Sequence, residues 1–234
     1  MEDKIIVAPQ IVIYKNLFKN SENLIKELEY DKDNSLFGKW KTWYSQGYRK
    51  EASFNSKELI DNDEFIYLKE IYDNINYIKK DYFEMFQGDK GIWPSFIKNW
   101  DSVVEQKDIV YIDYFKYNSR SKIHDKNLNA MDYHVDDFLL DSDSNGMRHV
   151  ITINFYLNDS YNGGEICAYD SHSGKSYKYK PSPGDAVVMP STAPFYHAVK
   201  DFDSERYFLR SFVDYYVDGK NNWDELLKNQ ENYV

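Results

Sequence analysis

The sequence predicts a mainly β protein in which N-terminal helices support a β-sandwich or β-barrel core. From residue 108 onward, eight short runs rich in β-branched and aromatic residues follow one another with no helical periodicity between them. Turn-forming residues separate several of them, at "NDSYNGGE", "SHSGK" and "PSPGD". The runs are "IVYIDYFKY", "AMDYHVDDF", "HVITINFYL", "EICAYD", "KSYKYK", "DAVVMP", "FYHAV" and "RYFLRSFVDYYV". This pattern of short β-runs separated by turns is typical of a β-sandwich or a β-barrel.

The N-terminal part of the chain has a different pattern. Residues 5–14 predict an extended segment that is broken at Pro9, and a helix capped by Ser21 follows it. The apolar side of that helix consists of Leu24, Ile25 and Leu28. The stretch "KWKTWYSQGYRKEASF" is interpreted as strand plus loop.

The longest helix is predicted at 56–86, because its apolar residues recur at helical spacing. Its expected buried side comprises Phe65, Leu68, Ile71 or Tyr72, Ile75, Ile78 or Lys79, Tyr82 and Phe86. Gly88 and Gly91 end it, and short helices are expected at "SFIKNW" and, capped by Asn222, near the C-terminus. We expect a single domain over 1–234, with support at 1–107, the β-core at 108–217 and a closing helix at 218–234.

Composition excludes several classes of function. The 39 acidic and 29 basic residues give a net charge of −10, which argues against binding of a phosphate backbone, so no nucleic-acid partner is expected. The single cysteine, Cys167, cannot form an intramolecular disulfide and fits a reducing compartment. The start of the chain lacks the apolar core of a signal peptide, and no apolar run is long enough to span a membrane. A cytoplasmic protein without a membrane partner is therefore expected.

The sequence "MDYHVDDF" contains a candidate metal site. On a strand, His134 and Asp136 share one face, and an imidazole beside a carboxylate forms half of such a site. His197, near the end of a later run, is the candidate third ligand, and a 2-His-1-carboxylate set leaves coordination positions open, as suits iron(II). The alternative is a surface pair beside an unrelated core histidine.

Arg206 begins the run that follows His197. A keto acid that binds the metal through one end projects its far carboxylate deeper into the barrel, where the planar fork of an arginine can pair with both oxygens. A buried arginine implies an anion, because burial of an unpaired charge is costly. The alternative is a surface strand arginine that faces Glu205 or Asp203.

These features together resemble the iron(II)- and 2-oxoglutarate-dependent dioxygenases, in particular their prolyl-4-hydroxylase-like branch. The likeness covers roughly residues 108–216 and rests on motifs in a fixed order. They are "HVD" at 134–136, "FYLND" at 155–159, "GGEI" at 163–166, "PSPGDAVVMP" at 181–190 and "HAVKDFDSERYFL" at 197–209. The order is specific, whereas an isolated HxD motif occurs often by chance.

The resemblance implies a double-stranded β-helix, or jelly roll, with the metal between its two sheets. It implies iron(II) on His134, Asp136 and His197, with 2-oxoglutarate and O2 as cosubstrates and ascorbate as an optional addition. It implies that Arg206 binds 2-oxoglutarate, that Tyr156 hydrogen-bonds its carboxylate and that Tyr117 lies near the iron. The reaction implied couples decarboxylation of 2-oxoglutarate to hydroxylation of a peptidyl prolyl residue, another protein side chain or a small molecule.

Two other functions stay open from the sequence. One is a non-catalytic jelly-roll module that binds or senses 2-oxoglutarate or oxygen, and the other is a cupin-like metalloenzyme that needs no oxo-acid. Arg210 shares a strand face with Arg206, so a second cation in the pocket is one alternative, but Arg210 is interpreted as a salt-bridging residue at the end of the barrel. His149 and Cys167 are interpreted as structural, and His124 and His172 as solvated loop residues.

Overall fold

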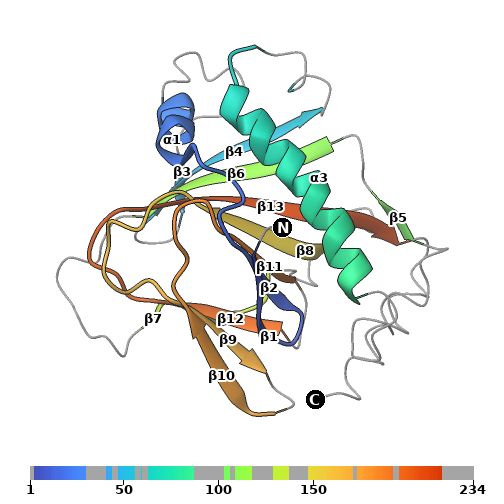
Figure 1. The fold of residues 1–234 in the computed structure, drawn as a ribbon, viewed down its shortest axis with the longest axis vertical. Coiled ribbons are helices and arrows are strands. Elements are labelled where there is room, and N and C mark those ends of the chain that lie inside the picture. The colour runs from blue at the N-terminus through green and yellow to red at the C-terminus, as the bar shows by residue number, and fades with distance from the viewer. Residues whose placement is uncertain are drawn as a thin grey trace.

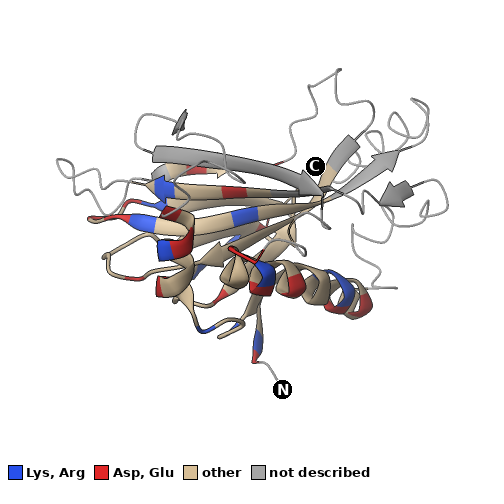
Figure 2. Cartoon of the chain, turned by 90° about the horizontal axis from the view of Figure 1, so that it is seen from above, with Lys and Arg blue, Asp and Glu red and all other residues tan. Residues whose placement is uncertain are grey.

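Two antiparallel β-sheets pack face to face, and helices cover the outer face of the larger sheet (Figures 1 and 2). The structure is a computed structural model that describes residues 3–29, 41–43, 47–55, 59, 63–86, 103–105, 109–117, 129–136, 147–170, 173–191 and 195–217. The predicted class, a mainly β fold with N-terminal helices and a jelly-roll core, is confirmed.

Eight strands, divided between the two sheets, form the jelly-roll core. They are β6 (Ile109–Tyr117), β7 (Asn129–His134), β8 (Met147–Tyr156), β9 (Ile166–Asp170), β10 (Lys175–Tyr179), β11 (Ala186–Pro190), β12 (Phe195–Lys200) and β13 (Arg206–Val217). Strands β6, β8, β11 and β13 lie in the large sheet, and the small sheet has the order β10-β9-β12-β7. All eight predicted runs therefore contain a strand.

N-terminal strands extend the large sheet at both of its ends. They are β1 (Lys4–Ala8), β2 (Ile11–Tyr14), β3 (Lys41–Trp43) and β4 (Gly47–Asn55), and the short β5 (Val103–Glu105) pairs with β13. The sheet order is β1-β2-β11-β8-β13-β6-β4-β3. The N-terminal part thus contributes strands to the large sheet as well as helices packed on it.

The two helices do not begin where their sequence patterns indicate. Helix α1 (Ser21–Glu29) has its first hydrogen bond accepted by the Asn20 carbonyl, so Ser21 lies in the first turn and is not the cap. Helix α3 starts at Ile66, not at residue 56, and ends at Phe86. Its start coincides with a contact from α1, where the Glu27 carboxylate accepts hydrogen bonds from backbone N–H groups in the first turn of α3. The helices predicted at 95–100 and 218–234 lie outside the described residues.

In the central strands β2, β8, β11 and β13, both faces of the large sheet are buried, because alternate residues of these strands belong to two different cores. One face packs on the helices and includes Tyr14, Ile153, Phe155, Val188 and Leu209, together with the buried stripe Leu68, Ile71, Ile75, Ile78, Tyr82 and Phe86 of α3. The opposite face packs on the small sheet and includes Ile13, Tyr156, Val187 and Met189. The buried side predicted for the long helix is therefore confirmed, and the space between the sheets is left for a site.

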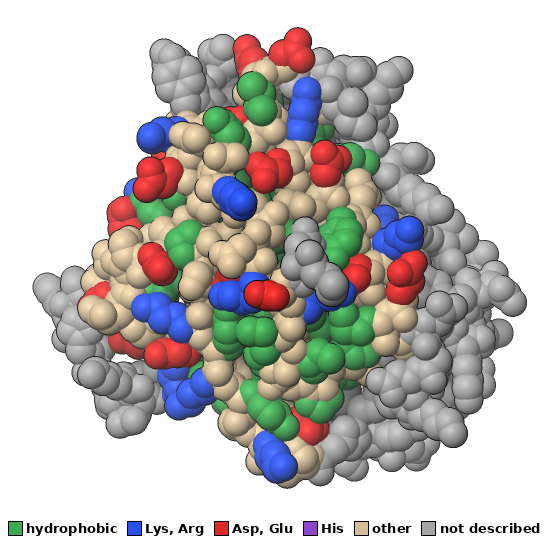
Figure 3. Space-filling view, viewed as in Figure 1, with side chains coloured by type: hydrophobic (Ala, Val, Ile, Leu, Met, Phe, Trp, Pro, Cys, Tyr) green, Lys and Arg blue, Asp and Glu red, His purple; other side chains and the backbone are tan. Residues whose placement is uncertain are grey.

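The surface carries acidic and basic side chains that alternate over the face seen in Figure 3, with hydrophobic side chains grouped in its lower half. Neither described helix is long and apolar enough to cross a lipid bilayer.

The "PSPGD" turn is held by a buried carboxylate. Asp185 has no exposed surface and accepts hydrogen bonds from Lys15 Nζ, the Tyr179 hydroxyl and the Ser182 backbone N–H. Asp185→Ala removes these three contacts and a fourth, from the Asn16 backbone N–H, and leaves the Lys15 ammonium partly buried without its carboxylate. We expect a loss of about 3 kcal/mol in the free energy of unfolding, measured by urea denaturation. Lys178→Ala, at an exposed position on β10, should change it by less than about 0.5 kcal/mol. Equal unfolding midpoints for the two variants would contradict this role.

Candidate metal site and cosubstrate pocket

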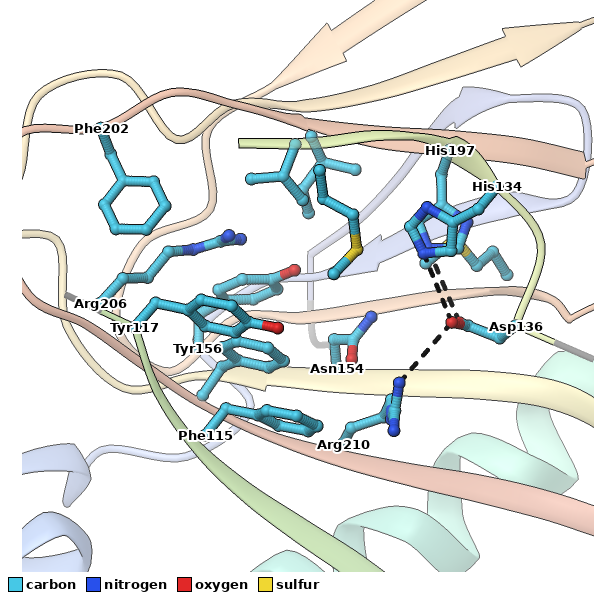
Figure 4. A pocket seen from close by; sticks show the side chains of 15 residues that line it. Phe115, Tyr117, His134, Asp136, Asn154, Tyr156, His197, Phe202, Arg206 and Arg210 are labelled. Carbon is cyan, nitrogen blue, oxygen red and sulfur yellow. Dashed lines mark ion pairs between the residues drawn. The ribbon is translucent and has the colours of Figure 1, made fainter. Parts of the chain in front are cut away.

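The pairing of the small sheet sets two histidines side by side. His134 on β7 lies directly opposite His197 on β12 in the antiparallel register. Their ring centroids are 4.2 Å apart, and both rings contact the space between the sheets (Figure 4). The strand ladder alone therefore brings together two imidazoles from distant parts of the chain.

Asp136 completes the cluster from outside the strand. The sequence predicted that it continues the β7 strand, but β7 ends at His134 and Asp136 lies at a bend two residues later. Asp136 Oδ1 is 3.7 Å from His134 Nε2, and Oδ2 is 3.6 Å from His197 Nε2. One ligand atom from each of the three residues lies within 4.8 Å of the others.

The donor chemistry of this cluster fits a divalent metal. The distances from the two Nε2 atoms to the carboxylate exceed ordinary hydrogen bonds, but they match two ligands that each bind one ion at roughly 2.1 Å. His134 Nδ1 is 2.7 Å from the Asp132 carbonyl oxygen, which can only accept, so the ring proton belongs on Nδ1. The lone pair on Nε2 then faces the Asp136 carboxylate, an arrangement that a cation stabilises. Two imidazoles and one carboxylate are a donor set that iron(II) accepts.

The charges in the cluster influence one another strongly. Burial raises the pKa of Asp136, but the facing His197, then His134 and Arg210, outweigh it and hold the pKa well below its usual range. Burial lowers the pKa of His197 to about 4 despite the attraction of Asp136. For His134 burial also opposes protonation, but its contacts with Asp136 and the Asp132 carbonyl prevail and raise the pKa. At neutral pH the cluster thus offers a carboxylate and a neutral His197, which are metal-binding forms.

Arg206 lies deep in the same pocket and has no acidic partner among the described residues. Its side chain is 3% exposed, and its Nε atom has no hydrogen-bond partner there. An aromatic cage surrounds the guanidinium, with ring centroids 5.1 to 6.0 Å from Cζ, and consists of Tyr156, Tyr161, Phe202 and Phe208. The surface alternative for Arg206 is wrong, since Glu205 pairs with Lys116 and Asp203 with Asn162.

The pocket between these two features is lined largely by aromatic side chains. Its floor is formed by Phe115, Phe208 and Tyr156 on three neighbouring strands, and the Phe115 and Phe208 rings stack 4.6 Å apart. Figure 4 shows Arg206 at one end, the His134–Asp136–His197 cluster at the other, and Tyr117 and Tyr156 between them. Burial raises the pKa of Tyr156, so its phenol stays protonated and able to donate a hydrogen bond. All six predicted site residues therefore line one cavity.

The sequence interpretation placed Arg210 at the end of the barrel, and this is wrong. It is salt-bridged as expected, with Nη2 2.8 Å from Asp113 Oδ2, but it lines the pocket and lies 3.7 Å from Asp136 Oδ1. Asn154 and Thr152 were not singled out from the sequence, although they have the same strand parity as Tyr156, which would have placed them on the pocket face. Asn154 lines the pocket, and Thr152 contacts Asp136.

The other histidines and the cysteine lie apart from the cluster or outside the described residues. His149 stacks on Phe212 at 3.9 Å, and Cys167 is buried in β9, where burial raises the pKa of its thiol. Both positions agree with structural roles. His124 and His172 are not among the described residues.

A jelly roll that carries two histidines and a carboxylate between its sheets has the architecture of the non-haem iron oxygenases. A comparison with known protein families shows which family this part of the chain resembles. The sequence model described as the 2OG-Fe(II) oxygenase superfamily matches residues 121–214, which contain all three residues of the cluster and Arg206. Over these residues, which make up less than half of the chain, the protein is similar to this superfamily of iron(II)- and 2-oxoglutarate-dependent oxygenases, and the His134–Asp136–His197 cluster is a candidate site for the iron. No curated protein matches the chain by sequence.

Solved structures with the same fold include prolyl hydroxylases. A prolyl-4-hydroxylase from Pseudomonas putida is 14% identical, with a TM-score of 0.54 over 87% of this chain and 91% of its own. A Trichoplax adhaerens prolyl hydroxylase, solved with a hypoxia-inducible-factor peptide, is 15% identical, with a TM-score of 0.55 over 87% and 83%. A Neurospora crassa protein, solved with alpha-KG and 5-formyluracil, is 13% identical, with a TM-score of 0.51 over 87% and 74%. At these identities the likeness is one of fold.

Proposed function

We propose that this protein is an iron(II)- and 2-oxoglutarate-dependent hydroxylase that acts on a prolyl residue or another protein side chain. His134, Asp136 and His197 would hold the iron, and Arg206 would bind the far carboxylate of 2-oxoglutarate. The iron, when bound, supplies the oxidation that couples decarboxylation of 2-oxoglutarate to hydroxylation of a substrate carbon.

The observation that carries this proposal is the burial of Arg206 without an acidic partner among the described residues. A buried cation destabilises a folded protein unless an anion compensates it. The Tyr161 hydroxyl, beside the guanidinium, is also buried without a hydrogen-bond partner in the described part of the chain. Both groups match a carboxylate ligand, which accepts hydrogen bonds from a guanidinium and from a phenol. A metalloenzyme that uses no oxo-acid would have no need of this arrangement.

The protein's own residues orient the cosubstrate and exclude water. Arg206 binds the far carboxylate, and the aromatic cage packs around the resulting ion pair. Because the cage excludes water and lowers the local dielectric constant, the ion pair is stronger there than in water. Tyr156, which forms part of the floor, would donate a hydrogen bond to the same carboxylate. Tyr117 also lines the pocket, and its ring meets the Phe202 ring edge-on with centroids 6.5 Å apart.

Two observations support a prolyl or other protein side chain as substrate. The apolar walls of the pocket, which include Met131, Ile166 and Val199, suit a neutral ring better than a charged group. Solved structures that share the fold include a prolyl hydroxylase with a bound peptide. The N. crassa structure with 5-formyluracil shows that a free nucleobase is the alternative to test on this fold.

Anaerobic titration tests the metal and cosubstrate parts of the proposal. Iron(II) followed by 2-oxoglutarate should produce a weak visible charge-transfer band with one equivalent of each. Absence of this band in a folded, metal-loaded sample would refute the proposal. Substrate class is then tested by mass spectrometry of proline-containing peptides, matched peptides with alanine in place of proline, and thymine. Gain of one oxygen atom by the proline peptides alone supports prolyl hydroxylation, whereas gain by thymine alone contradicts it.

A further inference from the structure

The carboxylate of the metal cluster is the ligand whose position the β-ladder does not determine. His134 and His197 are paired strand residues, so backbone hydrogen bonds fix their separation. Asp136 lies two residues beyond the end of β7, outside the strand ladder. Its side chain is 5% exposed, so contacts inside the pocket orient the carboxylate.

Among the residues that the structure describes, Asp136 has a contact at hydrogen-bond distance with the opposite sheet. Thr152, on β8, places Oγ1 2.7 Å from Asp136 Oδ2, and Thr152 itself has no exposed surface. Since a carboxylate can only accept, the Thr152 hydroxyl donates its proton to Asp136. Thr152 Oγ1 is also 2.9 Å from Ser191 Oγ, so the Ser191 hydroxyl must donate to Thr152. The result is a buried chain of two hydrogen bonds, in which Ser191 donates to Thr152 and Thr152 donates to Asp136.

Arg210 approaches the other carboxylate oxygen, but its contact with Asp136 is weaker than the hydrogen bond from Thr152. Its Nη1 is 3.7 Å from Asp136 Oδ1, beyond hydrogen-bond distance, whereas its Nη2 is 2.8 Å from Asp113. Phe115 and Phe212 flank the guanidinium at 4.8 and 4.7 Å. Arg210 therefore limits the space beside Oδ1, and Thr152 supplies the directed bond that sets the rotation of the carboxylate.

We propose that Thr152, supported by Ser191, is the positioning residue that holds the Asp136 carboxylate in metal-binding orientation before the metal arrives. This inference rests on the proposed function, because it assumes that the cluster binds a divalent ion. A carboxylate with one oxygen tied to Thr152 is hindered from rotating to offer both oxygens to the metal, which keeps coordination positions open for the cosubstrates. An outer partner of this kind typically changes metal affinity about 10- to 100-fold.

The test measures Mn(II) affinity of the protein alone, by the electron paramagnetic resonance signal of free Mn(II). Thr152→Val keeps the shape of the side chain and removes the hydroxyl, and we expect Mn(II) to bind about tenfold more weakly or worse. Thr152→Ser restores the hydroxyl and should bring the affinity back to within about threefold of the original. In an activity assay, Thr152→Val should raise the iron requirement and leave the KM for 2-oxoglutarate unchanged, because Arg206 is untouched.

Ser191→Ala separates positioning from packing. It breaks the same buried hydroxyl pair but keeps the bond from Thr152 to Asp136, so its thermal stability should fall as in Thr152→Val while its Mn(II) affinity falls less. Thr152→Ala removes the hydroxyl without a branched side chain and serves if Thr152→Val does not fold. Equal Mn(II) affinity of the original protein and the folded Thr152 variants would overturn the inference and leave the proposed function standing. Failure of the original protein to bind Mn(II) would overturn both.

Discussion

Replacing Arg206 with methionine should abolish saturation by 2-oxoglutarate at concentrations that saturate the original protein. Loss of one partner from a buried, hydrogen-bonded charge pair costs about 2–5 kcal/mol, which corresponds to a rise of roughly 30-fold to several thousandfold in the 2-oxoglutarate concentration required. The effect is expected on KM, because the substitution removes a binding contact distant from the metal cluster. Succinate formation as a function of 2-oxoglutarate concentration measures it.

The same variant should not destabilise the protein when no 2-oxoglutarate is bound. Arg206 is buried without an acidic partner among the described residues, so methionine, which fits the aromatic cage, should leave the ligand-free protein as stable as before or more stable. Thermal unfolding with and without 2-oxoglutarate and Mn(II) separates the two effects. Lys116→Met, which removes a cation that pairs with the exposed Glu205, is the matched control and should preserve the 2-oxoglutarate response. A normal response in Arg206→Met would show that another group binds the cosubstrate.

His197→Ala should lose metal binding and hydroxylation together. His197 is 5% exposed and faces Asp136 at 3.6 Å, so alanine leaves two ligand residues that cannot hold the ion alone. The loss in Mn(II) affinity should exceed the roughly 100-fold upper range found when only an outer partner is removed. Titration of Mn(II) followed by paramagnetic resonance measures it, and the visible band with iron(II) and 2-oxoglutarate should disappear.

His149→Ala is the matched control for His197→Ala. His149 is another described histidine of the core strands, but it stacks on Phe212 and is not a member of the cluster. Its replacement should cost some stability and leave Mn(II) affinity intact. If His197→Ala retained the affinity of the original protein, the assignment of His197 as a ligand would be wrong.

Period-two patterns account for most of what the sequence predicted well. Strand residues two apart share a face, so the sequence predicted the eight core strands and the shared strand face of Arg206 and Arg210. The motif order around His134, Asp136 and His197 led to the superfamily whose sequence model matches residues 121–214. The structure brings these residues together, while their roles stay predictions.

Long-range contacts account for what the sequence missed. The start of α3 depends on Glu27, some forty residues away, and the strand places of β1 to β4 depend on neighbours elsewhere in the large sheet. The place of Arg210 in the pocket follows from its pairing with Asp113 on another strand. Asp136 was expected on the strand because its spacing fits one, but the chain bends after His134, and Thr152 provides the contact that a ladder would otherwise supply.

The central claim is that one divalent ion and one dicarboxylate occupy opposite ends of the same pocket. Crystals grown anaerobically with Mn(II) and 2-oxoglutarate, with anomalous diffraction recorded at the manganese edge, test it most directly. The account predicts a single strong anomalous peak among His134 Nε2, His197 Nε2 and the Asp136 carboxylate, with the far carboxylate of 2-oxoglutarate on Arg206. A peak at another place, or a ligand carboxylate that avoids Arg206, would contradict it.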